Sequence, residues 1–349
     1  MSEKSLNFNI APADEAAKRR AIDRWNGVAK PIGSLGVFED IVVQIAGLTG
    51  EEDVRLDKRA VLAMCADNGV VEEGVTQTGQ EITSLVAGNM LKKISSVCVM
   101  GSVANIDVVP VDVGMATKVE GVADFSTSRG TANFTKGPAM TREQAIHAIN
   151  AGVEMVGRLR DEGCNIIVAA EMGIGNTTSS SAVASVLLDK PVEVVTGKGA
   201  GLSNEGLQRK VAAIRKTIAL NQPDPSDALD VLAKVGGFDI AGMAGTFIGG
   251  AIHRVPVVID GFISAVAALI ALRICPECRL AIIPSHMSEE PASRLIFDEL
   301  GMSPIINAGL RLGEGTGAVL LLPMLDMALA LYRGKSFGDI GMDAYEVDL

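Results

Sequence analysis

The feature that most constrains this fold is an alternation of short apolar runs with amphipathic stretches, which begins near residue 60. The runs are rich in β-branched residues, as strands are. The predicted strands are Ala60–Cys65, Ile106–Val113, Asn165–Ala169, Val192–Val195, Val255–Asp260 and Leu280–Ile283. Several are continuously apolar, which is typical of strands covered on both faces. The pattern therefore predicts an α/β fold with a mainly parallel sheet and flanking helices.

The stretches between the strands have helical periodicity. In Thr141–Arg160 the apolar residues recur mostly at spacings of three and four, with Thr141 and Glu143 at the start and Gly163 beyond the end. Gly206–Leu220 has a similar pattern.

The two ends of the chain differ from its middle. Residues 1–50 are charged and helical in pattern, and the last thirty residues are apolar and helical. We expect residues 1–50 and 320–349 to pack together as a small helical subdomain, and residues 51–319 to form the α/β domain.

Composition and charge exclude several classes of function. The net charge of −11 argues against a nucleic-acid partner, although a single nucleotide needs only a few local donors. The N-terminus lacks the pattern of a secretory signal, and the longest apolar run, Gly261–Leu272, is too short to cross a bilayer. We expect a cytoplasmic protein without a membrane partner.

The cysteines give no sign of a metal site. Five are scattered along the chain, and Cys275 and Cys278 form the only CxxC pair, with no second pair to complete four zinc ligands. A structural role is the favoured interpretation.

Two segments combine a carboxylate with glycines. They are Glu171–Thr178, which reads EMGIGNTT, and Arg311–Gly317, which reads RLGEGTG. Backbone N–H groups beside glycines can approach a phosphate closely, because no Cβ intervenes. A carboxylate held there is a candidate general base for a phosphorylated substrate.

Four predicted strands are followed by glycine or polar residues. These segments are Glu171–Thr178, Thr196–Leu202, Asp260–Ser264 and Pro284–Glu290. Each alone fits an ordinary turn or helix cap as well as a binding segment. Thr196–Leu202 matches neither a Walker A loop nor a dinucleotide fingerprint, and a mononucleotide phosphate site stays open there. Since the carboxyl ends of parallel strands lie at one edge of a sheet, together they predict a pocket for phosphate and ribose.

Ordered along the chain, these segments resemble the nicotinate-nucleotide:dimethylbenzimidazole phosphoribosyltransferase family of cobamide nucleotide-loop assembly. The resemblance covers nearly the whole chain. It is carried by Lys30–Gly36 (KPIGSLG), Cys65–Val70 (CADNGV), Glu171–Thr178, Asp260–Ser264 (DGFIS), Ser285–Glu289 (SHMSE) and Arg311–Gly317. It implies a Rossmann-like sheet, a helical subdomain from the chain ends, and a homodimer that uses no metal or other cofactor. A heterodimer with a paralogue stays open.

The resemblance also implies a reaction and roles for residues. Phosphoribosyl would move from nicotinate mononucleotide to a lower-ligand base, giving α-ribazole 5'-phosphate and nicotinate. Glu314 matches the general base, and Glu171 matches a carboxylate that stabilises positive charge at the ribose C1 carbon. The implied phosphate and ribose ligands are Gly173, Gly175, Asn176, Thr177, Thr178, Gly199, Gly201, Ser285 and, more weakly because helix lysines usually lie in solvent, Lys210. The implied acceptor pocket comprises Thr76, Thr78, Gln80, Met172 and Leu312.

Two departures from the family pattern leave the acceptor open. Asp67–Val70 has Asn68 where the family usually has His, and Gly74–Thr83 lacks the usual aromatic residue and proline. The acceptor can therefore be dimethylbenzimidazole or a related base, or phenol or p-cresol with Glu314 deprotonating the hydroxyl.

Three other functions fit the sequence less well. A transferase that uses phosphoribosyl pyrophosphate would carry paired acidic residues after an apolar strand, and no such pair is found. A dinucleotide-dependent dehydrogenase would carry a glycine fingerprint after the first strand. A non-catalytic paralogue subunit would have no physical need for Glu171 and Glu314.

Overall fold

A six-stranded, all-parallel sheet forms the centre of the computed structural model, which describes residues 6 and 8–343. The strands are β1 (Arg59–Ala66), β2 (Asp107–Gly114), β3 (Ala123–Asp124), β4 (Ile166–Met172), β5 (Val257–Ile259) and β6 (Ile282–Ile283). Their order is β3-β2-β1-β4-β5-β6, so the direction of strand addition reverses between β1 and β4. Sheets of this order bind ligands at the carboxyl ends of the strands beside that reversal. The α/β prediction is confirmed.

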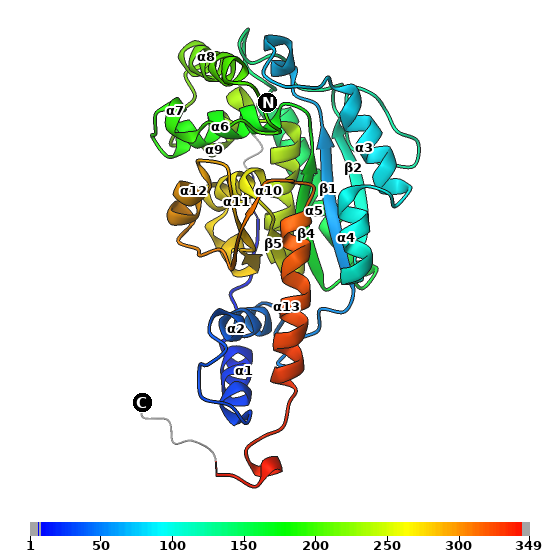
Figure 1. Cartoon of the computed structure of the whole chain (residues 1–349), viewed down its shortest axis with the longest axis vertical. Coiled ribbons are helices and arrows are strands. Elements are labelled where there is room, and N and C mark those ends of the chain that lie inside the picture. Colours follow the sequence, from blue (N-terminus) through cyan, green and yellow to red (C-terminus); the bar gives the residue numbers. More distant parts are fainter. Residues whose placement is uncertain (1–5, 7, 344–349) are drawn as a thin grey trace.

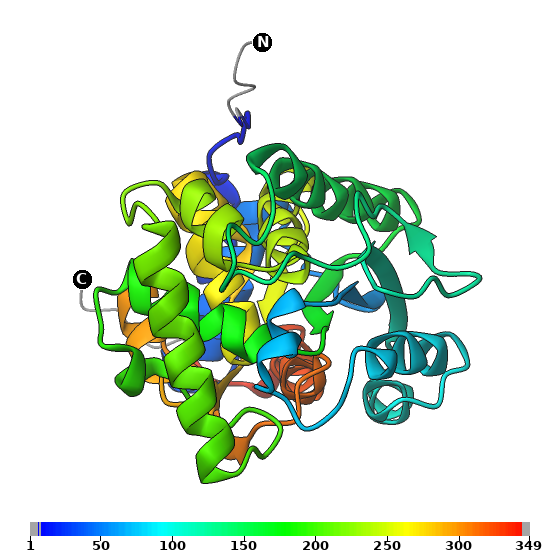
Figure 2. The same ribbon diagram turned by 90° about the horizontal axis from the view of Figure 1, so that it is seen from above.

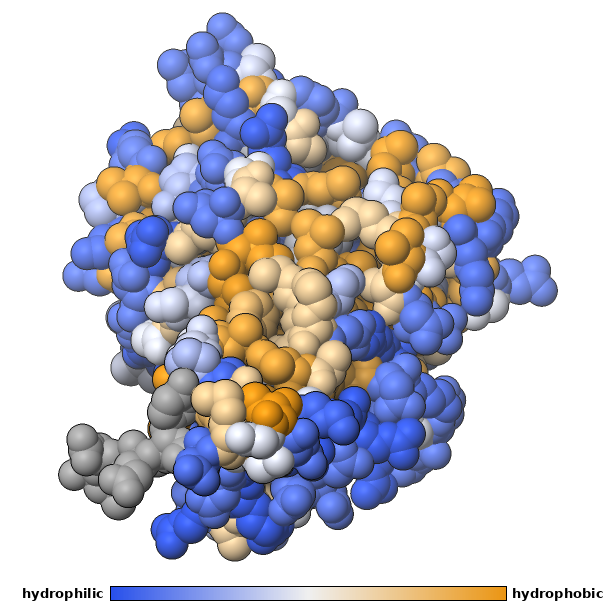
Figure 3. All heavy atoms as spheres, turned by 60° about the horizontal axis from the view of Figure 1, so that its bottom comes forward, coloured by the Kyte–Doolittle hydropathy of each residue, from blue (hydrophilic) through white to orange (hydrophobic). Residues whose placement is uncertain are grey.

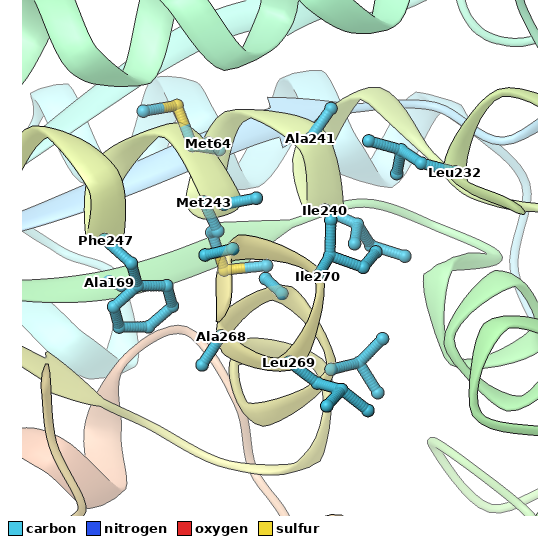
Figure 4. Packing of buried hydrophobic residues seen from close by; sticks show 14 of the residues in the cluster. Met64, Ala169, Leu232, Ile240, Ala241, Met243, Phe247, Ala268, Leu269 and Ile270 are labelled. Atoms are coloured by element: carbon cyan, nitrogen blue, oxygen red, sulfur yellow. The ribbon is translucent and has the colours of Figure 1, made fainter. Parts of the chain in front are cut away.

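Helices cover both faces of the sheet (Figures 1 and 2). On one face lie α5 (Arg142–Asp161), α10 (Phe238–His253) and α11 (Phe262–Ile274), and on the other lie α3 (Glu81–Leu91), α4 (Ser96–Ala104) and α13 (Thr316–Tyr332). Alternate residues of β1 supply the two cores: Leu62 and Met64 face the first set, Val61 and Cys65 the second. Figure 4 shows Met64 among α10 and α11 side chains. Every β1 residue is buried, which explains the continuously apolar run.

The remaining elements complete the layers. They are α6 (Asn176–Leu187), α7 (Val192–Val195), α8 (Asn204–Asn221), α9 (Ala228–Val235), α12 (Ser293–Leu300), the parallel pair β7 (His286–Ser288) and β8 (Ile306–Leu310), and the 3-10 turns η1 (Gly69–Glu73), η2 (Pro276–Ala281) and η3 (Gly338–Ile340). The prediction of helix around Thr141–Arg160 is confirmed: Thr141 caps α5, and its reciprocal partner is Gln144.

The predicted strand Val192–Val195 is wrong, because these residues form the single helical turn α7. Val192 and Val195 are buried while Val194 is 49% exposed. Two buried residues three positions apart fit a helical turn, whereas a strand in the sheet would bury the whole run. The strands β7 and β8 were not predicted.

Helices from the first fifty residues lie beside the foot of α13, and this foot belongs to the last thirty residues (Figure 1). The helices α1 (Glu15–Gly27) and α2 (Val37–Thr49) lie there, and the rings of Trp25 and Tyr332 are 4.8 Å apart between centroids. An antiparallel bridge joins Val28 to Ser336. The division into a helical subdomain and an α/β domain stays a prediction, and residues 1–5, 7 and 344–349 of that subdomain lie outside the described residues.

The cysteines are buried and unpaired. Burial raises the pKa of the Cys275 thiol to about 11 and raises that of Cys278 further. Among the residues that the structure describes, no group of three or more His, Cys, Asp or Glu side chains could hold a metal ion. No helix in the described ranges is long and apolar enough to cross a membrane.

Candidate active site

A cavity opens at the carboxyl ends of β4 and β5, beside the reversal in strand order. Four segments form most of its wall: the end of β4, the start of α6, the residues after β5, and the turn before α13. The site residues predicted from sequence that line it are Glu171, Met172, Gly173, Asn176, Thr177, Gly199, Leu312 and Glu314. Both predicted catalytic carboxylates thus share one cavity.

Glu171 is the penultimate residue of β4, and its partly buried side chain lines the cavity. Burial raises the pKa of Glu171 to about 8, and the neighbouring Asp239 and Asp260 act in the same direction. The Asn176 side-chain amide and the Glu314 backbone oppose this by hydrogen bonding to the charged form. A Cβ at Gly313 would lie 3.0 Å from Glu171 Oε1, so a glycine there lets the turn approach this carboxylate.

Glu314 lies in a tight turn with left-handed backbone. Its φ is +60°, and the flanking Gly313 and Gly315 have φ values of +86° and +89°. Such a conformation is unfavourable for a non-glycine residue. Asp260 stabilises it, because its two carboxylate oxygens accept the N–H groups of Gly315 at 3.1 Å and Ala318 at 3.0 Å. The first turn of α13 is thereby anchored to the end of β5.

The carboxylate of Glu314 lines the cavity with one oxygen unpartnered among the described residues. Within the described part of the chain, its Oε2 atom is buried and has no hydrogen-bond partner. Burial raises the pKa of Glu314, while the backbone N–H of Val97, at the start of α4, favours the charged form. A buried acceptor without a partner is costly unless a ligand supplies the donor.

The N-terminus of α6 lies at the wall of the cavity. The helix begins at Asn176 after Gly175, whose φ is +96°, and Thr177 and Gly199 line the same part of the cavity. The partial positive charge at a helix N-terminus attracts phosphate. The predicted phosphate segment thus lies at a helix N-terminus, and its phosphate role stays a prediction.

Lys210 lies directly behind that segment, not in solvent as a typical helix lysine does. Its side chain is fully buried, and Nζ donates to Thr177 Oγ1 at 2.9 Å and to the Gly197 carbonyl at 3.2 Å. Burial lowers the pKa of Lys210 to about 8, and Glu290 opposes the shift. A positive charge is therefore held one side chain away from the cavity.

Ser285 is also behind the wall. Its hydroxyl donates to the Asp260 carbonyl at 3.2 Å and is 3.1 Å from Nδ1 of His286, which lines the cavity. Gly317 packs against the His286 ring, since a Cβ there would lie 2.0 Å from Nδ1. Ser285 therefore orients cavity-lining groups from outside the wall.

Other predicted site residues are away from the cavity wall. Gly175 and Thr178 are buried behind it, and Gly201 accepts a hydrogen bond from Gln77 on the 74–80 segment. In that segment Thr76 Oγ1 donates to the Thr78 carbonyl, and Gln80 donates to the Asn68 carbonyl. The acceptor roles of Thr76, Thr78 and Gln80 stay predictions.

Sequence reasoning assigned no role to several groups of the site. Asp260, Glu290 and Arg311 line the cavity, and Asp239 lies just behind Asn176. Asp239 could have been noticed in the sequence, because it is the only carboxylate in α10, whose other residues are mostly apolar. A charge in such a helix is rarely buried without a partner.

Comparisons with known proteins agree on one kind of enzyme. A family model described as phosphoribosyltransferase matches residues 10–341. The chain is 47% identical to the nicotinate-nucleotide–dimethylbenzimidazole phosphoribosyltransferase of Ruminiclostridium cellulolyticum, covering 99% of this chain and 98% of the relative. It is 48% identical to the enzyme of the same name from Acetivibrio thermocellus, covering 93% of each. The crystal structure of CobT from Thermus thermophilus superimposes with a TM-score of 0.89 at 35% identity, covering 95% of this chain and all of that one.

Proposed function

Because the chain belongs to the nicotinate-nucleotide–dimethylbenzimidazole phosphoribosyltransferase family, we propose that it transfers phosphoribosyl from nicotinate mononucleotide to 5,6-dimethylbenzimidazole. The products are α-ribazole 5'-phosphate and nicotinate. The observation that carries the proposal is the pair Glu171 and Glu314 in one cavity with the N-terminus of α6.

The first half of the reaction needs no general acid. Nicotinate is bound to the ribose as a pyridinium, so when the C1–N bond breaks its electron pair passes to nitrogen and the ring leaves neutral. Positive charge then develops on the ribose at C1. The ionised Glu171 stabilises this charge from the wall of the cavity.

The second half needs one base. A ring nitrogen of dimethylbenzimidazole attacks C1 and forms the new C–N bond, and the proton on its other nitrogen must leave. Glu314 Oε2 accepts that proton, since it is a buried acceptor without a partner among the described residues. The raised pKa of Glu314 brings it closer to working pH, which favours proton transfer.

The phosphate of the donor is assigned to the α6 end of the cavity. Thr177 and Gly199 line this end, the helix dipole favours an anion there, and Lys210 adds a charge behind Thr177. Met172 and Leu312 lie on the wall of the same cavity and are assigned to the acceptor.

A direct assay tests the proposal. Purified protein is incubated with nicotinate mononucleotide and separately with dimethylbenzimidazole, adenine, phenol and p-cresol, and nicotinate and the new glycoside are followed by mass. We expect nicotinate release and a glycoside with dimethylbenzimidazole. Release only with the phenols would move the enzyme to the phenolic branch, and folded protein that releases nicotinate with none of them would contradict catalysis.

We also propose that two copies of the chain associate through an apolar surface on α4 and α13. Apolar side chains gather across the face shown in Figure 3. On these helices Val99 and Val103 are 61% and 86% exposed, and Leu320 and Met327 are 41% and 66% exposed. Exposed apolar surface of this kind is typical of an interface between proteins. The family resemblance favours a second copy of this chain as the partner. The cytoplasmic location expected from the sequence stays a prediction.

Light scattering tests this association. The wild-type protein is expected at twice the chain mass of 36.3 kDa, and Val103→Asp at the mass of one chain, because a charge in an apolar interface is strongly unfavourable. Leu220→Asp, at a 53% exposed position on α8, should leave the mass unchanged. A monomeric wild-type protein would refute the proposed dimer.

A further inference from the structure

Asp239 is a buried carboxylate that the proposed reaction does not use directly. It lies in the first turn of α10 and is fully buried, behind the cavity wall. Its Oδ1 atom accepts the backbone N–H of Ile240 at 3.0 Å. Its Oδ2 atom accepts a hydrogen bond from Asn176 Nδ2 at 2.9 Å.

Asn176 connects this carboxylate to the active site. Its amide nitrogen donates to Asp239 Oδ2 and also to Glu171 Oε2. An amide nitrogen has only two hydrogens, so both are used and the orientation of the side chain is fixed. The packing is tight as well, since a Cβ at Gly173 would lie 2.4 Å from Asp239 Oδ2.

We propose that Asp239 is a positioning residue, which holds the Asn176 amide against Glu171 and, through its charge, sets when Glu171 ionises. This inference rests on the proposed function, because it assigns Glu171 to the developing charge at C1. The carboxylate of Asp239 fixes the Asn176 amide, and this amide fixes the carboxylate of Glu171, which faces the substrate.

The charges around the pair give the direction of the effect. Asp239 is faced by Asp67 from the residues after β1 and by Glu171 from β4, and Glu171 is also faced by Asp260. Burial raises the pKa of Asp239 to about 6, below that of Glu171 at about 8. Asp239 is therefore charged first as pH rises, and its negative charge opposes ionisation of Glu171.

The pH profile of kcat for Asp239→Asn tests the proposal. An amide oxygen at 239 can still accept from Asn176, but the charge is gone, so Glu171 ionises more easily. We expect the acid limb to move about one unit to lower pH, with the plateau within about threefold of wild type. In a Glu171→Gln background, Asp239→Asn should cause no shift of the acid limb relative to Glu171→Gln alone, because the carboxylate whose ionisation responds to Asp239 is absent. An unmoved limb, or an equal shift in the Glu171→Gln background, would overturn the inference.

Asp112→Asn is the matched control. Asp112 is 2% exposed on β2, accepts the N–H groups of Gly114 and Met115 and pairs with Arg129, with no hydrogen bond to Asn176. It should leave the acid limb in place, and a shift equal to that of Asp239→Asn would show a general charge effect and overturn the inference. Thermal unfolding identifies any variant that fails to fold.

A double-mutant cycle keeps the test decisive if Asp239→Asn does not fold. Asn176→Ala removes the link from its other end, and we expect kcat to fall about tenfold while Asp239→Ala adds little to it. Fully additive losses would overturn the link. Wild-type protein that releases no nicotinate contradicts the proposed function itself, whereas an active wild type with an unmoved Asp239→Asn limb contradicts this inference alone.

Discussion

Replacing Glu314 by Gln is expected to lower kcat by about 10²- to 10⁴-fold, because the acceptor then has no base to take its proton. The substitution keeps the size and shape of the side chain in a turn with little freedom. Binding of nicotinate mononucleotide should change little, since the phosphate is assigned to the α6 end of the cavity and not to Glu314. Nicotinate release and calorimetric binding of the nucleotide measure the two quantities.

Two variants separate this loss from a loss of structure. Glu289→Gln changes an exposed glutamate outside the cavity lining and should retain wild-type turnover. Glu314→Gly removes the carboxylate and also relieves the positive φ of +60°, so the fold should gain about 1 kcal/mol while turnover is lost. An inactive protein that is more stable than wild type cannot owe its inactivity to unfolding. Turnover of Glu314→Gln near the wild-type rate would refute its role as the base.

The strand pattern predicted the sheet well because a doubly covered parallel strand must be apolar at every position. β1 is such a strand, and all its residues are buried. Val192–Val195, which reads VEVV, was misassigned because four residues are too few to distinguish a strand from one turn of helix. Only a longer run or the packing against neighbouring elements distinguishes the two, and four residues of sequence contain neither.

Some residues of the candidate site could likewise be predicted from the sequence, and others could not. Glu171 and Glu314 were identifiable because each lies close to glycines, and Glu171 also follows a predicted strand. Asp239 lies 63 positions from Asn176 in sequence, and only the packing of α10 against the end of β4 brings the two together. The burial of Lys210 is equally hard to predict from the local sequence, since every other charged residue of α8 is exposed.

Replacing Lys210 by Met is expected to raise the KM for nicotinate mononucleotide about 10- to 100-fold, the range for losing one charge-assisted interaction. The linear apolar side chain fills a similar buried volume without the charge. The effect should fall on KM more than on kcat, because the phosphate binds in both the ground state and the transition state. Initial rates over a range of nucleotide concentrations measure the split.

The pH dependence gives an independent test of the same residue. Only protonated Lys210 attracts phosphate, and burial lowers its pKa to about 8, so kcat/KM should fall as pH rises through that value. In Lys210→Met this basic limb should disappear, because no proton remains to be lost. Lys216→Met, at an exposed position on the same helix, should keep both the wild-type KM and the limb. If Lys210→Met kept them too, the phosphate would have to depend on the α6 N-terminus and Thr177 alone, and the buried lysine would serve only to hold Thr177 and the Gly197 carbonyl in place.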